Sequence, residues 1–235
     1  MIINEKEVLN TERFKDLSWA KVAKDYIIQL GGLGGIGSWT ALLLSRAGFN
    51  IHAFDFDNVD DTNLGGQLYS SNTVNLSKSE AITMILNELA PGHNLIAHNV
   101  KLQFDKIEDS AIISPFVVTG FDNMAARKGM FEQWFEKFNT NKKGFFIDGR
   151  MRAEGFQLYY VSSIEDAERY AKTLFSDKDV PDEICSIKAT SHVGAMIGSL
   201  ITALVANHFS DADNDPRSNP YYTTVDLELF NFEVK

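Results

Sequence analysis

Cysteine is almost absent from this sequence of 235 residues, which contains Cys185 and no other thiol. One thiol cannot close a disulfide within the chain, and it cannot supply the several thiolates of a structural zinc site. The sequence is therefore compatible with a reducing compartment, and we expect a cytoplasmic protein that carries no zinc.

Positive charge is also in short supply, because 22 Lys and Arg residues face 32 Asp and Glu residues. The formal net charge is −10 at pH 7, and such a surface repels nucleic acids and anionic membranes. We therefore expect no nucleic-acid partner and no membrane partner. A locally positive pocket for phosphate groups is still compatible with this charge.

Long hydrophobic runs are missing as well. The longest one, residues 193–205, is too short to span a bilayer and is interrupted by Gly194, Gly198 and Ser199, so it predicts a buried helix. Residues 1–7 lack the basic start and the apolar run of a signal peptide. Hydrophobic residues make up 44% of the chain, which is enough for a folded core.

Strand and helix patterns alternate over the first 150 residues, which predicts a parallel, doubly wound α/β sheet of the Rossmann type. Short apolar or alternating runs indicate the strands, and longer amphipathic or Ala/Leu-rich runs indicate the helices. The expected strands are 26–30, 50–54, 94–102, 112–119 and 144–148. The expected helices are 10–24, 38–47, 77–90 and 124–138.

The pattern changes after residue 150. A strand at 155–162 follows its predecessor too closely for a crossover helix, so we expect it to be antiparallel to its neighbour. A helix at 164–175, an acidic polar crossover segment, the buried helix at 191–208 and a strand run at 221–234 complete the prediction. We therefore expect one domain, 1–235, with a nucleotide-binding half (1–150) and a mixed-sheet half (151–235).

A glycine-rich loop fits the G-x-G-x-x-G pattern between a predicted strand and a predicted helix. Its glycines are Gly32, Gly34, Gly35 and Gly37, and Asp55 ends the following strand. Glycines allow the backbone to approach a phosphate at a helix N-terminus, and an acid about 20 residues further on is placed to bind a ribose. The loop alone leaves NAD, FAD, S-adenosylmethionine and ATP as alternatives.

A second motif follows the loop and narrows this choice. Asp57, Asn63, Gln67 and Lys78 follow Asp55 in a fixed order, with Val59 and Leu64 between them. This order resembles the ThiF/MoeB and ubiquitin-activating enzyme family. Further segments with the same resemblance are 119–123 with Arg127, 149–151 with 154–155, and 193–200.

The resemblance implies ATP-dependent adenylylation of a carboxylate, with ATP and Mg²⁺ as cofactors. The implied partner is a small ubiquitin-like or sulfur-carrier protein, a β-grasp fold with a C-terminal glycine tail, and the implied assembly is a homodimer. Lys78 would supply a point charge, and the amides of Asn63 and Gln67 would donate to phosphate oxygens. Asp122, at the end of a strand, would hold Mg²⁺ beside the phosphates.

One position departs from the family pattern, since Gly66 stands where the family has an arginine that contacts the triphosphate. Arg13 is a substitute candidate, because it resembles the N-terminal family element that crosses a dimer interface to reach the partner's ATP. Arg127 and Arg150 are further candidates. A surface or ion-pair role is the alternative for all three arginines.

Cys185 precedes the predicted buried helix and resembles the family cysteine that forms a covalent link with the activated protein. Such a role needs a thiolate, whereas the alternative is a small structural cysteine. Two further readings of the whole chain stay open. One is a non-catalytic ATP-binding interaction module of the same fold, which Gly66 favours. The other is an NAD-dependent oxidoreductase, supported only by the glycine loop and Asp55.

Overall fold

The computed structural model describes residues 9, 11–104, 112–138, 143–175, 190–210 and 217–235. Its helices are η1 (Glu12–Phe14), α1 (Ser18–Val22), η2 (Ala23–Asp25), α2 (Gly37–Ala47), η3 (Asp61–Asn63), η4 (Ser71–Thr73), α3 (Lys78–Leu89), α4 (Met124–Phe138), α5 (Ile164–Ala171) and α7 (Ser191–His208). Its strands are β1 (Ile27–Gly31), β2 (Asn50–Phe54), β3 (Asn94–His98), β4 (Phe116–Thr119), β5 (Phe145–Arg152), β6 (Gly155–Val161), β7 (Tyr222–Asp226) and β8 (Asn231–Val234).

All of these strands belong to one sheet, in the order β3-β2-β1-β4-β5-β6-β7-β8. The pairings from β3 to β5 are parallel, and those from β5 to β8 are antiparallel. The predicted α/β fold, a Rossmann-like sheet with antiparallel strands added in the C-terminal half, is confirmed. The short turn between β5 and β6 explains the change, because a parallel connection needs a crossover of a dozen or more residues.

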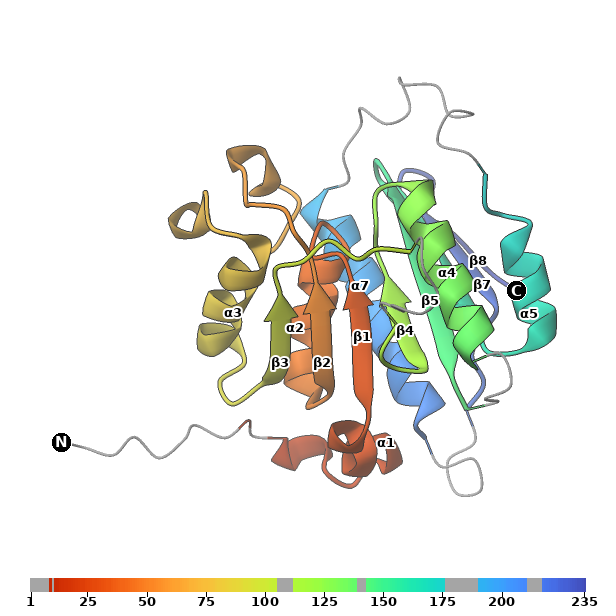
Figure 1. Cartoon of the computed structure of the whole chain (residues 1–235). Coiled ribbons are helices and arrows are strands. Elements are labelled where there is room, and N and C mark those ends of the chain that lie inside the picture. The colour runs from red at the N-terminus through yellow and green to blue at the C-terminus, as the bar shows by residue number, and fades with distance from the viewer. Residues whose placement is uncertain (1–8, 10, 105–111, 139–142, 176–189, 211–216) are drawn as a thin grey trace.

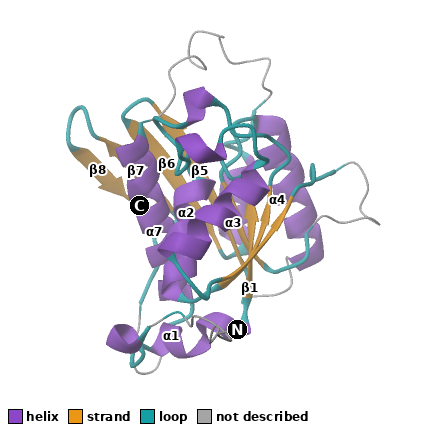
Figure 2. Cartoon of the chain, turned by 90° about the vertical axis from the view of Figure 1, so that its left-hand side faces the viewer, coloured by secondary structure: helices purple, strands orange, loops and turns teal. Residues whose placement is uncertain are grey.

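Helices cover both faces of the sheet (Figures 1 and 2). Helices α2, α3 and α7 pack on one face, where their apolar residues join those of β1, β2 and β6 in one core. Helices α4 and α5 pack on the other face, over β4, β5 and β6, around a second core. Helix α1 lies at the amino-terminal end of β1 (Figure 1). Among the described helices, none is long and apolar enough to cross a membrane.

Helix α7 lies unusually close to α2 because two of its glycines face that helix. A Cβ atom on Gly194 would lie 2.6 Å from the carbonyl oxygen of Gly35 and 2.8 Å from Cδ1 of Trp39. A Cβ atom on Gly198 would lie 3.0 Å from the backbone nitrogen of Thr40. Larger residues at these two positions would therefore push the two helices apart.

Several predicted boundaries differ from the structure. The strand predicted at 144–148 continues to Arg152, because β6 pairs with it as far as Gly155. The run at 221–234 is a hairpin of two antiparallel strands, and the Asp226 carboxylate accepts the backbone amide of Leu229 in its turn. Strand β3 is shorter than predicted, as are β4 and α5, and the region predicted as a helix at 10–24 holds the short helices η1, α1 and η2.

Candidate functional site

The topology has a switch point where the strand order reverses. After β1 the chain builds β2 and β3 on one side, and β4 then pairs with the other side of β1. Because these strands are parallel, the loops that follow β1, β2 and β4 leave the sheet at the same edge. Ligands of open α/β sheets bind at this switch point. The glycine loop, residues 32–37, lies at its centre.

The glycines of this loop do different things. Gly32 has a φ of 87°, in the left-handed region, and a Cβ atom on Gly37 would lie 1.8 Å from the carbonyl oxygen of Gly32. Gly37 is thus required for helix α2 to begin against the loop. In contrast, a Cβ atom on Gly34 would meet nothing within 4 Å. The backbone at Gly34 therefore borders open space at the N-terminus of a helix, where anions bind favourably.

Asp55 braces the glycine loop from the end of β2. Its Oδ2 accepts the amide of Leu33 at 2.6 Å, and its Oδ1 accepts the amide of Asp57 at 2.8 Å. Burial raises the pKa of Asp55, and the nearby charge of Lys78 opposes that rise. Asp55 therefore holds the loop, and a contact of Asp55 with a ribose stays a prediction.

Lys78 is the first residue of α3 and is only 7% exposed. Its Nζ lies 2.9 Å from Oδ2 of Asp57 and 4.0 Å from Oδ2 of Asp55. A capping box between Ser77 and Glu80 starts the helix, and the Lys78 amide donates to the Asp57 carbonyl at 2.8 Å. The structure therefore brings Lys78 to Asp55 and Asp57, which precede it by more than 20 positions in the sequence.

Asn63 and Gln67 lie in the turn region after β2. The side-chain oxygen of Asn63 accepts the backbone amide of Asp60 at 3.0 Å, and the backbone amide of Gln67 donates to the backbone carbonyl of Asn63 at 2.9 Å. Oε1 of Gln67 is buried without a hydrogen-bond partner among the described residues, so a ligand donor would find an acceptor here. Gly66 sits against α2, since its carbonyl accepts the indole N–H of Trp39 at 3.2 Å.

Asp122 follows β4 on the other side of the glycine loop and is exposed. The side-chain amide of Asn123 donates to Oδ1 of Asp122 at 3.2 Å. Oδ1 of Asn123 accepts the backbone amide of Ala126 at the start of α4. The described residues contain no cluster of three His, Cys, Asp or Glu that could hold a metal. An exposed carboxylate nevertheless fits Mg²⁺, which proteins commonly bind through one or two carboxylates together with phosphate oxygens and water.

Arg13 is exposed in η1, at the opposite edge of the sheet. The ring of Phe14 stacks on Trp19, and Trp19 stacks on Phe49, which precedes β2. Arg13 therefore lies away from the glycine loop of its own chain, and its action across a dimer interface stays a prediction. Cys185 lies outside the described residues.

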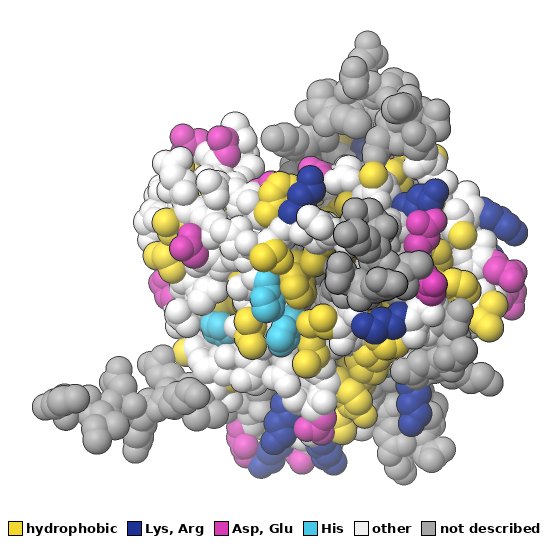
Figure 3. Space-filling model, in the orientation of Figure 1, with side chains coloured by type: hydrophobic (Ala, Val, Ile, Leu, Met, Phe, Trp, Pro, Cys, Tyr) yellow, Lys and Arg dark blue, Asp and Glu magenta, His cyan; other side chains and the backbone are white. Residues whose placement is uncertain are grey.

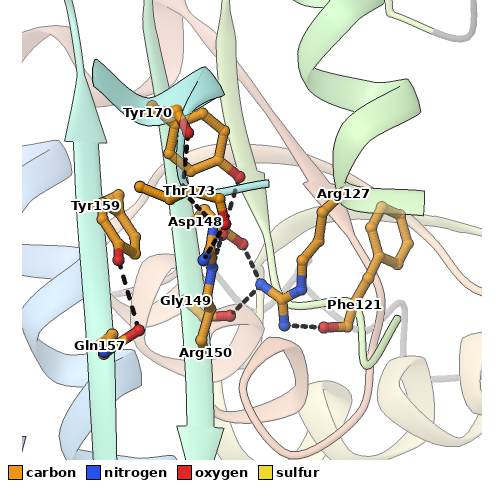
Figure 4. A network of polar contacts seen from close by, with 9 residues as sticks. All are labelled: Phe121, Arg127, Asp148, Gly149, Arg150, Gln157, Tyr159, Tyr170 and Thr173. Atoms are coloured by element: carbon orange, nitrogen blue, oxygen red, sulfur yellow. Dashed lines mark hydrogen bonds and ion pairs between the residues drawn. The ribbon is translucent and has the colours of Figure 1, made fainter. Parts of the chain in front are cut away.

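Arg127 and Arg150, the other two candidates for the missing arginine, both bind one carboxylate (Figure 4). That carboxylate is Asp148, a fully buried residue of β5 that also accepts from Tyr170. Neither Asp148 nor Tyr170 was among the residues predicted from the sequence. The signal available was an acid inside an otherwise apolar strand, which demands buried partners.

Two other features lie away from the glycine loop. The described part of the chain has a hollow of about 470 Å³ beside α3 and β3, lined partly by Met84 and Ala97, and it contains none of the predicted site residues.

On the opposite face of the sheet, histidine side chains gather among hydrophobic ones (Figure 3). His52 lies on β2 and His98 on β3, and their nearest ring nitrogens are 3.1 Å apart. Burial lowers the pKa of His52, and the nearby charge of His98 lowers it further.

Comparison with known sequences decides the family. The sequence model of the ThiF family matches residues 9–234. This chain belongs to the ThiF family. Among the curated relatives of this ThiF-family chain is the adenylyltransferase and sulfurtransferase MOCS3 of Aedes aegypti, 35% identical over 41% of this chain and 22% of the relative. Ubiquitin-like modifier-activating enzyme 5 of Branchiostoma floridae is 30% identical over 34% of this chain and 20% of the relative. The matches thus span about a fifth of these relatives.

Solved structures share the fold of this ThiF-family chain. PaaA superposes with a TM-score of 0.69 at 14% identity, over 93% of this chain and 66% of PaaA. The structure of E. coli MccB with ATP superposes with a TM-score of 0.68 at 15% identity, over 92% of this chain and 65% of MccB. At this level of identity the likeness establishes the fold alone.

Proposed function

We propose that this ThiF-family chain uses ATP to adenylylate a carboxylate. The observation that carries the proposal is the buried Lys78, which lies with Asp55 and Asp57 at the switch point beside the open glycine loop. The loop and the acid are the features of a dinucleotide site, and Lys78 is a buried positive charge in addition to them. A lysine in that place provides a fixed positive charge for phosphate groups.

The reaction joins a carboxylate oxygen to the α-phosphorus of ATP, while the bond from that phosphorus to the bridging oxygen breaks and pyrophosphate leaves. Two anions approach one another, so positive charge and oriented donors determine the rate. In our proposal Lys78 neutralises phosphate charge, and the backbone amides of the glycine loop bind phosphate oxygens. Asn63 and Gln67 provide further donors. Asp122 would hold Mg²⁺, which neutralises phosphate charge when bound.

The proposed substrate is the C-terminal carboxylate of a small ubiquitin-like or sulfur-carrier protein. Relatives that carry the names of a MOCS3 adenylyltransferase and of a ubiquitin-like modifier-activating enzyme support this choice. We also propose a homodimer in which Arg13 of one protomer serves the partner's site. Transfer of the activated carbonyl to Cys185 is a further proposed step, and adenylylation does not require it.

A non-catalytic module that keeps ATP binding is the second candidate. Gly66 favours it, because this position lacks the side-chain charge that the family pattern provides. In that case the site would hold nucleotide without forming pyrophosphate, and the protein would act through its surface.

Titration calorimetry with Mg²⁺ and ATP, NADH or S-adenosylmethionine tests the cofactor, and we expect only ATP to bind. Isotope exchange between ATP and pyrophosphate, in the presence of a β-grasp protein ending in Gly-Gly, then tests turnover. Lys78→Ala should lose about 3–4 kcal/mol of transition-state stabilisation. Lys128→Ala, at an exposed lysine of α4, is the matched control and should exchange at the wild-type rate.

Each outcome separates the candidates. Tight binding of NADH without ATP would refute adenylylation. ATP binding without exchange, for several β-grasp proteins, would favour the non-catalytic module. Wild-type exchange in Lys78→Ala would remove the role given to this lysine.

A further inference from the structure

A carboxylate at the centre of β5 has no access to water. Asp148 is 0% exposed and lies beside Thr119 of β4 and Tyr159 of β6. A buried charge of this kind is tolerated only when other groups neutralise and hydrogen-bond it. Asp148 meets this requirement with both of its oxygens (Figure 4), since Oδ1 accepts from Arg127 and Oδ2 accepts from Arg150 at 2.7 Å and from the Tyr170 hydroxyl at 2.9 Å.

Arg127 connects this carboxylate to the loop that bears Asp122. Besides Asp148, the Arg127 guanidinium donates to the Gly149 carbonyl at 2.8 Å and to the Phe121 carbonyl. Phe121 directly precedes Asp122, so the peptide group that joins them is held by a buried side chain. The guanidinium itself is positioned by Asp148, because a fork of donors needs a fixed anion to be oriented.

Arg150 extends the same network to α5 and β6. Its terminal nitrogens donate to the hydroxyl of Thr173 at 2.9 Å and to its carbonyl at 3.3 Å, just after α5. Its guanidinium lies over the ring of Tyr159, 4.5 Å from the centroid. Burial, followed by the nearby Asp148, raises the pKa of Tyr170 well above its usual value, so Tyr170 stays a donor to Asp148.

The backbone at Gly149 and Gly120 also packs against the glycine loop. Cβ atoms placed on Gly149 and on Gly120 would lie 3.0 Å and 2.9 Å from side-chain atoms of Ile36, which immediately precedes helix α2. Ile36 is thus enclosed between β5 and the loop after β4. If the loop that bears Asp122 moved, it would clash with Ile36 of the glycine loop on one side or break its hydrogen bond with Arg127 on the other.

We propose that Asp148 is a positioning residue that acts through Arg127 to fix the Phe121–Asp122 peptide, and so sets where Asp122 presents its carboxylate to magnesium-bound ATP. This inference rests on the proposed function, because it assigns the loop a metal-dependent task. Asp148 itself touches neither metal nor nucleotide. Its effect should therefore appear in the dependence of ATP binding on Mg²⁺ rather than in the binding of free ATP.

The test is titration calorimetry of the full chain with ATP over a series of Mg²⁺ concentrations and in EDTA. Asp148→Asn should raise the Mg²⁺ concentration that half-maximally tightens ATP binding by about tenfold, in line with other residues that orient metal ligands. Affinity for ATP in EDTA should stay at the wild-type value. Hydrogen exchange of the Asp122 and Asn123 amides in the ligand-free variant should become faster.

Two further variants keep the test decisive. Arg127→Lys retains the charge without the fork and should reproduce the Mg²⁺ effect even where Asp148→Asn does not fold. Thr173→Val removes the hydroxyl that accepts from Arg150 and donates to the Tyr170 carbonyl, but it leaves the contacts of Arg127 in place, and its Mg²⁺ dependence should be that of the wild type. The inference would be overturned by an equal loss of ATP affinity with and without Mg²⁺, or by an unchanged Mg²⁺ dependence in both Asp148→Asn and Arg127→Lys. Failure of the wild-type chain to bind ATP would overturn the proposed function, and the inference with it.

Discussion

Two glycines of the same loop, Gly34 and Gly37, should respond in opposite ways to replacement by alanine. At Gly37 the new methyl group would lie 1.8 Å from the Gly32 carbonyl oxygen and 2.8 Å from its carbon. Both atoms belong to the backbone, so neither can rotate away. At Gly34 the methyl group would meet nothing within 4 Å, and Gly34 is not among the described glycines with positive φ.

These geometries give different magnitudes. Alanine at a helix position gains up to about 1 kcal/mol over glycine from propensity. At Gly37 overpacking opposes this gain by about 3 kcal/mol, the upper end of the range for cores, so the clash wins. At Gly34 no clash opposes the gain of about 0.4–1 kcal/mol from a less flexible unfolded chain. The methyl group would, however, occupy the space through which, in the proposed function, a phosphate reaches the loop.

Denaturant unfolding and ATP titration calorimetry measure the two effects separately. Gly37→Ala should lower the free energy of unfolding by about 2 kcal/mol, the difference between the clash and the propensity gain. Gly34→Ala should be at least as stable as wild type and should bind ATP at least about tenfold more weakly, a loss of about 1.4 kcal/mol. Wild-type ATP affinity in Gly34→Ala, or a wild-type unfolding free energy in Gly37→Ala, would refute the assignment of these roles.

Three further substitutions test other parts of the proposal. Arg13→Ala should leave a dimer in light scattering but slow pyrophosphate exchange, and a monomeric wild-type chain would contradict the trans role. Cys185→Ala should keep pyrophosphate exchange and lose any thiol-sensitive complex with the carrier protein; loss of exchange would contradict this order of steps. The His208 ring lies between the Tyr160 hydroxyl and the Lys143 carbonyl, and burial lowers its pKa below the usual 6.5. The imidazole of His208 therefore binds a proton more readily in the unfolded chain than in the folded one, so the free energy of unfolding should fall as pH drops below about 6.5. His208→Gln should reduce the slope of unfolding free energy against pH, measured by urea titrations.

Local sequence patterns were sufficient for the parts of the fold that local interactions determine. The glycine loop lies between a buried strand and a helix, so its neighbours in the sequence already specify its place. Asp55 and Lys78 were predictable for the same reason, because each stands at the end of one element or the start of the next. The antiparallel turn into β6 followed from the shortness of the connection.

Contacts between distant segments explain what the sequence did not reveal. Strand β5 extends to Arg152 because β6 pairs with it, and no property of residues 149–152 alone requires that. Asp148 meets Arg127 and Tyr170 only once α4 and α5 are packed on the same face of the sheet. The assignment of Arg127 and Arg150 as candidates for phosphate contact ignored such a buried competitor for their charge.

The close packing of α7 on α2 bears on how the molecule is divided. Helix α2 starts at the glycine loop, whereas α7 is made by residues 191–208, more than a hundred positions later in the chain. A fragment that ends near residue 150 would expose the apolar face that α7 covers, and the loop would lose the helix behind it. We therefore expect that residues 1–150 do not fold on their own. A bulky residue at Gly198 should therefore destabilise the glycine loop and the rest of the sheet together, so that both unfold in one cooperative transition.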